Sequence, residues 1–383
     1  MARDINKRVG VKEYNDAGAL ARFYGFQPIL APEIHKQDLE QVKKFDQSVS
    51  PGEKAALLRM YFEDKSISQP QPGMYWVERP FKGSGEKKKA HKLECLLVSM
   101  GSVKSVCECL AIQAGLAILH SLGYKDAELR LNSVGDKDSC NEFERKMTAF
   151  IRKNYNNYPG ELRQALKKNV FALLTEPKKE WEQFRTECPK SIDFLSETSR
   201  NQFKEILEFL EMMDIPYTID NTLVGDPSFG SETVFSFVSE KENGERLAFG
   251  VRTNRLGKKL GHKKEVPLVT LNIEAKYKKQ PKKIKVKPYN PDFYLIQFGP
   301  EAKLKSFLVL EELRKAGASV AHSIARDKLG SQMGIAESSN IPYILLMGQK
   351  EALDNSIMLR NTATRAQELI PIPELAARIK KLK

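Results

Sequence analysis

The chain has 383 residues, of which 41% are hydrophobic and 29% are charged. This is the composition of an ordinary globular protein, long enough for two or three domains with their own cores. No apolar run approaches the roughly 20 residues that span a bilayer, and the N-terminus has no apolar signal segment. We therefore expect a cytoplasmic protein without a membrane partner.

The cysteines and the net charge indicate which kinds of bond, metal site and binding partner to expect. Five scattered cysteines, an odd number, argue against a disulfide framework, and they have no partners at metal-ligand spacing, so we expect no bound metal. The formal net charge is +13, and lysines crowd the stretch 258–287. A lysine run is often only a solvated surface, but the length of this one favours a polyanion held mainly through phosphate. Its candidate RNA contacts are Lys279, Lys282 and Lys283.

The first part of the chain predicts a sheet covered by helices. Apolar spacing predicts helices over 17–26, 53–64 and 105–124. Residues 73–80 and 92–101 predict an antiparallel strand pair with a long polar loop, and 126–135 predict a further strand. Charged helices fill about 139–214, and strands return in "TVFSFVSE", "ERLAFGVR" and "PLVTLNIEA". This order predicts an α+β core over 1–275, an antiparallel sheet with a helical insertion.

A second domain follows a basic, proline-punctuated linker predicted over 276–291. The apolar strands "FYLIQFG", "SVAHSI" and "IPYILLMG" alternate with segments of helical periodicity, ending in "IPELAARIKKLK". That alternation is typical of a small parallel or mixed α/β domain, here 292–383.

Several segments, in this order, resemble histidyl-tRNA synthetases, which are class II enzymes. They are "ARFYGFQPILAPEI", "LNSVGDKDSCNEFERKM", "FLSETSRNQFKEILEFLEMMDIPYTID" and "RDKLGSQMGIAESSNIPYILLMGQKE". The resemblance covers nearly the whole chain. It implies a class II antiparallel-sheet core, a homodimer formed through the first segment, and an anticodon-binding-like domain from Tyr294 onward. It also implies tRNA or another structured RNA as partner, with contacts from Arg326, Lys328, Gln332 and Lys350.

The catalytic motifs of the family are altered. Fixed arginines stabilise the charge that develops on the α-phosphate, since a guanidinium holds two phosphate oxygens at once. Glu78 matches the glutamate of the second class II motif, but the arginine two residues earlier is Trp76, which we expect to pack as an apolar side chain. The arginine of the third motif becomes Ala275. In the histidine-specific motif RGLDYY, Gly225 stands for the arginine, and Phe229 and Gly230 stand for the tyrosines.

Three positions remain from the ancestral pocket: Glu53, Glu78 and Arg252. Glu53 lies in "PGEKA", which resembles the amino-acid-binding loop PEGTA, with Lys54 in place of threonine. Arg252 matches the arginine of GGGRYDGL, but most of the surrounding glycines are gone, so we expect a filled pocket floor.

The resemblance leaves several functions open. We favour an RNA-binding relative that has lost aminoacylation. Its rivals are an active histidine–tRNA ligase, which alone implies ATP and Mg²⁺, and a regulatory subunit of ATP phosphoribosyltransferase. Such subunits generally lack the anticodon-binding domain. A scaffold that binds proteins through the old dimer face is a further possibility.

Overall fold

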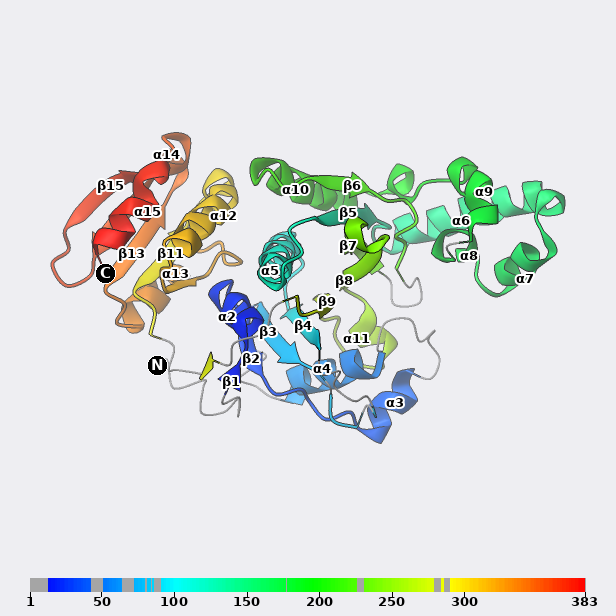
Figure 1. Cartoon of the computed structure of the whole chain (residues 1–383), viewed down its shortest axis with the longest axis horizontal. Coiled ribbons are helices and arrows are strands. Elements are labelled where there is room, and N and C mark those ends of the chain that lie inside the picture. Colours follow the sequence, from blue (N-terminus) through cyan, green and yellow to red (C-terminus); the bar gives the residue numbers. More distant parts are fainter. Residues whose placement is uncertain are drawn as a thin grey trace.

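A computed structural model describes residues 13–42, 51–63, 72–79, 81–83, 85, 91–176, 178–225, 231–278, 284–285 and 290–382. Its centre is an eight-stranded sheet of order β2-β3-β4-β9-β8-β7-β5-β6 (Figure 1). The strands are β2 (Gln27–Ile29), β3 (Gly73–Glu78), β4 (Lys92–Met100), β5 (Ala127–Ser133), β6 (Tyr217–Ile219), β7 (Ser231–Ser239), β8 (Glu245–Thr253) and β9 (Leu268–Lys276).

Most neighbouring strands of this sheet run antiparallel, and β2–β3 and β5–β6 are parallel. The α+β class and the class II-like sheet are therefore confirmed. The long hairpin of β3 and β4 is also confirmed, with Glu78 opposite Cys95. β6 was not predicted, because three residues are too few to show a period.

Helices cover both faces of the sheet, since successive strand residues point to opposite sides. We call one side the α5 face. It is covered by α2 (Asp16–Phe23), α5 (Val106–Leu122) and α10 (Glu197–Met212), and Leu97 packs there. The α4 face carries α4 (Pro51–Glu63) and α11 (Leu256–Lys259), with α3 (Lys36–Val42) alongside α4, and Leu96 and Val98 pack on this face.

The helical insertion forms a lobe with its own core. It contains α6 (Lys137–Asn154), α7 (Gly160–Lys168), α8 (Ala172–Thr175) and α9 (Glu182–Glu187). Asp136 begins α6 by accepting a hydrogen bond from the Ser139 amide at 3.0 Å. Phe143, Leu173 and Trp181 pack together inside the lobe, which extends away from the rest of the molecule in Figure 1.

The C-terminal unit is a five-stranded mixed sheet of order β12-β11-β13-β14-β15. Its strands are β11 (Phe293–Gln297), β12 (Val320–His322), β13 (Tyr343–Met347), β14 (Ser356–Asn361) and β15 (Gln367–Pro371). Its helices are α12 (Pro300–Lys315), α13 (Leu329–Ser338), α14 (Gln349–Leu353) and α15 (Ile372–Lys381). The first three strands pair in parallel and the last two antiparallel, which confirms the mixed α/β prediction.

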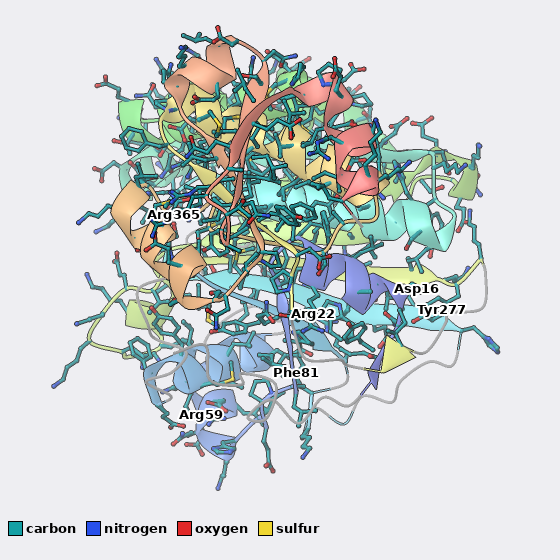
Figure 2. All side chains as sticks on the ribbon, turned by 90° about the vertical axis from the view of Figure 1, so that its left-hand side faces the viewer. Asp16, Arg22, Arg59, Phe81, Tyr277 and Arg365 are labelled. Carbon is teal, nitrogen blue, oxygen red and sulfur yellow. The ribbon has the colours of Figure 1, made fainter. Side chains whose placement is uncertain are left out.

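Two sets of contacts connect distant parts of the chain. β1 (Glu13–Tyr14) pairs with β10 (Ile284–Lys285), which falls in the stretch predicted as linker. Beside it, Asn15 Nδ2 donates to Tyr277 Oη at 3.1 Å, and Figure 2 shows Tyr277 next to the start of α2. The C-terminal unit packs on the α5 face, where the Phe307 ring lies 4.6 Å from that of Phe209.

Candidate functional site

Arg252 is buried on the α5 face and has no free donor. It is 1% exposed, and its guanidinium pairs with both carboxylate oxygens of Glu108 on α5. The remaining N–H groups donate to the carbonyl oxygens of Ser102 and Lys104, at 2.9 and 2.8 Å, and to Asn254 Oδ1 at 3.3 Å. A guanidinium has five N–H donors, and all five are used within the protein.

The charges around Arg252 make this cation part of the fold. Burial alone would lower the pKa of Arg252, but the Glu108 carboxylate outweighs it and raises that pKa above its ordinary value. Nearby, burial raises the pKa of Glu232, against the opposing effects of Arg252 and of the Asn254 amide, which donates to Glu232 at 2.7 Å. The carboxyl groups of Glu108 and Glu232 therefore surround the Arg252 cation within the protein itself.

A second cation, Arg79, lies at the α4 face just past β3. Its Nη2 donates to Glu53 Oε2 and to Asn272 Oδ1, both at 2.8 Å, and its Nη1 donates to Glu274 Oε1 at 3.2 Å. Glu274 also pairs with Lys92 at 3.0 Å. Arg79 and Glu53 are each about 5% exposed and Glu274 is 45% exposed, so this network of two carboxylates and two cations runs from the core to the surface.

Two of the three positions of the missing arginines are filled by packing. Trp76 is 1% exposed and lies in the core of the α5 face with α2, where a Cβ on Gly18 would come within 3.2 Å of the indole. Ala275 is buried in the same core. The Phe235 ring covers Gly250 so closely that a Cβ there would lie 2.2 Å from it, a contact in line with the filled floor expected near Arg252.

The structure does not bring the three residual pocket positions together. Glu53 belongs to α4 and faces Arg79, whereas Arg252 contacts α5 on the opposite side of the sheet. Glu78 is half-buried at the end of β3. Phe229 and Gly230 lie outside the described residues. At these positions the side chains do not fit the arginine clasp that a nucleotide phosphate needs.

Sequence reasoning missed Glu108 and Arg79. Glu108 did carry a signal, because it is the one acidic or basic residue, histidine aside, in the apolar run Val106–Leu122. A single carboxylate in such a helix indicates a buried ion pair. Among the described residues, no group of three His, Cys, Asp or Glu side chains is placed to hold a metal ion.

A cavity of about 600 Å³ lies between the core and the C-terminal unit. Its floor includes Phe209 and Phe307. At its edge the Asp327 carboxylate accepts from both Lys104 and Lys303, so one negative charge is shared between two cations.

The predicted RNA contacts of the C-terminal unit occupy different environments. Lys328 and Lys350 are exposed, and Arg326 is half-buried, with Nη1 donating to Ser331 Oγ at 3.1 Å. Gln332 is fully buried, and its amide bonds the backbone of Gln297 in both directions, so it is not presented at the surface. Lys279, Lys282 and Lys283 lie outside the described residues.

The sheet, the insertion and the C-terminal α/β unit define a class II aminoacyl-tRNA synthetase-like protein. A family model described as an anticodon binding domain matches residues 293–382. The chain is 26% identical over 348 residues to the histidine–tRNA ligase of Halothermothrix orenii, covering 88% of this chain and 82% of that protein. It is 23% identical over 343 residues to that of Chlorobium phaeobacteroides, covering 87% and 79% respectively.

Among solved structures, apo histidyl-tRNA synthetase of S. aureus has the same fold. The TM-score is 0.52 and the identity 20%, over 94% of this chain and 93% of that one. These similarities support the histidyl-tRNA synthetase family of class II. Within the described residues, no helix is long and apolar enough to cross a bilayer.

Proposed function

We propose that this chain is a histidyl-tRNA synthetase-like protein that binds tRNA or another structured RNA and has lost adenylation. The observation that carries the proposal is the saturated guanidinium of Arg252, held by Glu108 and by backbone carbonyls. A transition-state cation stabilises developing charge through donors that point at the reacting group, and Arg252 has no donor left for one. Trp76 and Ala275, packed in the core, support the same conclusion.

The RNA-binding half of the proposal is supported by the anticodon-binding domain match and by exposed cations on that unit, among them Lys328 and Lys350. The domain counts against the regulatory-subunit alternative, since such subunits generally lack it. The curated relatives, named histidine–tRNA ligases, favour the active-ligase alternative, because they match over 78–83% of their own length.

Two measurements on the full chain test the proposal. The first is histidine-dependent exchange of labelled pyrophosphate into ATP, with an active histidine–tRNA ligase as positive control. We expect no exchange above the blank, and exchange that requires histidine would establish the ligase instead. The second is binding of a tRNA transcript at two salt concentrations, where we expect salt-sensitive binding. Retention of a phosphoribosyltransferase without RNA binding would favour the regulatory subunit.

We also propose a homodimer, formed through the stretch 21–34 that resembles the class II dimerisation motif. Sedimentation velocity gives the mass directly. A monomer at micromolar concentration would contradict the dimer and leave the RNA-binding proposal intact.

A further inference from the structure

The lysine cluster that stands out in the sequence is divided in space. Between residues 255 and 290 there are twelve Lys and Arg and two Glu, which accounts for most of the net charge. The strand β9, Leu268–Lys276, runs through the middle of this stretch. Nine residues of extended chain separate its ends by roughly 27 Å. The cluster is therefore two surfaces, one before β9 and one after it.

The surface after β9 is partly neutralised where the structure describes it. Lys278 pairs with Glu242 at 3.0 Å, and its ammonium lies 4.0 Å from the centre of the Tyr124 ring. That lysine is committed to contacts within the chain.

The surface before β9 is a rigid basic turn. We call residues 255–264 the α11 turn. Leu256 and Leu260 anchor it, at 0% and 3% exposed, in the core of the α4 face. The His262 amide donates to the Gly257 carbonyl at 2.9 Å and closes the turn. These contacts fix the backbone while the lysines project outward.

The α11 turn has more basic side chains than there are acidic side chains paired with them. Lys258 is 60% exposed and pairs with Glu265 at 3.3 Å. Lys263 and Lys264 are exposed, and no ion pair joins either to a carboxylate within the described ranges. Beside them Phe62, 36% exposed, stacks on the His262 ring at 4.3 Å. Lysines next to a partly open aromatic ring are typical of surfaces that contact nucleic acid.

We propose that the α11 turn is a second RNA-contacting surface, which holds the phosphate backbone of the RNA that the C-terminal unit binds. This inference rests on the proposed RNA-binding function. The turn lies across the sheet from the C-terminal unit in Figure 1. Figure 2 shows the same separation between Arg59, on the helix α4 that carries Phe62, and Arg365 of the C-terminal unit. We therefore expect a folded RNA of tRNA size to reach both surfaces and a short stem-loop to reach only one.

A membrane surface fits the α11 turn poorly. Both of its leucines point into the core, so it has no outward apolar face with which to enter a bilayer.

The test compares two variants with the same charge change. One is K258Q/K263Q/K264Q in the α11 turn, and the control is K153Q/K167Q/K168Q, three exposed lysines of the insertion. Both should keep the melting temperature of the parent chain. The probes are a full-length tRNA transcript and its isolated anticodon stem-loop.

We expect the α11 variant to weaken transcript binding about fivefold or more, and to reduce the slope of log K against log salt by about 2. Its binding of the stem-loop should match that of the parent, and the control should change transcript binding less than twofold. Equal losses in the two variants would overturn the inference while the RNA-binding function stands. Failure of the parent chain to bind either probe would overturn both. Vesicles of phosphatidylserine that lose binding with the α11 variant, while the transcript does not, would identify a membrane and overturn the inference.

Discussion

Replacing Arg252 by methionine tests whether this guanidinium is part of the fold. The change removes the cation but keeps a long apolar side chain. Glu108, itself 1% exposed, is then left with a buried charge and no counter-ion. Breaking a buried pair by removing one partner costs about 3–5 kcal/mol. Against a total stability of roughly 5–15 kcal/mol, R252M should lose at least about a fifth of it.

Two companion variants show where that energy comes from. R252K keeps the positive charge beside Glu108, so it should destabilise the chain less than R252M does. It should still cost about 2 kcal/mol, because an ammonium cannot reach both carboxylate oxygens and both carbonyls. The double variant R252M/E108L removes both charges and should recover at least about 2 kcal/mol relative to R252M alone. Such recovery requires the two side chains to be coupled, as their shared hydrogen bonds indicate.

The assay is urea unfolding of the full chain, followed by far-UV circular dichroism at pH 7. R145M is the control, because Arg145 pairs with Glu142 on an exposed helix surface, and we expect no resolvable change. A loss below about 1 kcal/mol in R252M would refute the structural role, since that is within the range of ordinary surface substitutions. Stabilisation of the parent chain, but not of R252M, by added ATP and histidine would assign Arg252 to a ligand site instead.

Three further predictions concern the filled pocket and pH. W76R should destabilise the chain by about 3 kcal/mol or more and restore no pyrophosphate exchange, because it buries an unpaired charge against α2; W76F is the packing control. G250A should cost about 1–3 kcal/mol, since its new Cβ meets the Phe235 ring, and F235L should relieve part of that cost in the double variant. Burial lowers the pKa of His322 to about 4. Between about pH 6.5 and pH 4 the unfolded chain then binds the proton more readily, so stability falls as the pH falls through this window, by up to roughly 2–3 kcal/mol. H322Q should remove that part of the pH dependence, as unfolding measured at pH 7 and at pH 4.5 will show.

Much of the architecture could be predicted from the sequence, because apolar residues recur along its longer helices and strands with the period of each element. The apolar run of α5, the strands β7 and β8, and the "KENG" turn between them were all expected at their observed places. Asn243 and Gly244 in that turn have positive φ, as the residue types suggested. The elements missed are short or polar. β14 and β15 form an antiparallel hairpin whose residues alternate too weakly to indicate strands, and β15 is mostly exposed.

The site was only partly predictable, because ion pairing depends on which residues meet in space. The packing role expected for Trp76 followed from the residue type and is confirmed. Glu53 and Arg252 were grouped as remnants of one pocket, but their charges are balanced by different partners on opposite faces. Those partners, Arg79 and Glu108, lie 26 and 144 residues away in the chain. No sequence spacing indicates pairs that are formed at such separations.

The pattern of charge compensation supports the proposal that the scaffold binds RNA without adenylation. A cation in a catalytic cleft acts through an uncompensated charge, whereas the structure pairs Arg252, Arg79 and Lys303 with carboxylates of the same chain. Each pairing stabilises the fold and weakens the attraction for a phosphate at that point. Exposed lysines such as Lys263 and Lys264 keep their charge available to a large polyanion. Phosphate contacts from such lysines need a positive surface but no converging guanidinium groups, so binding tolerates substitutions that adenylation cannot.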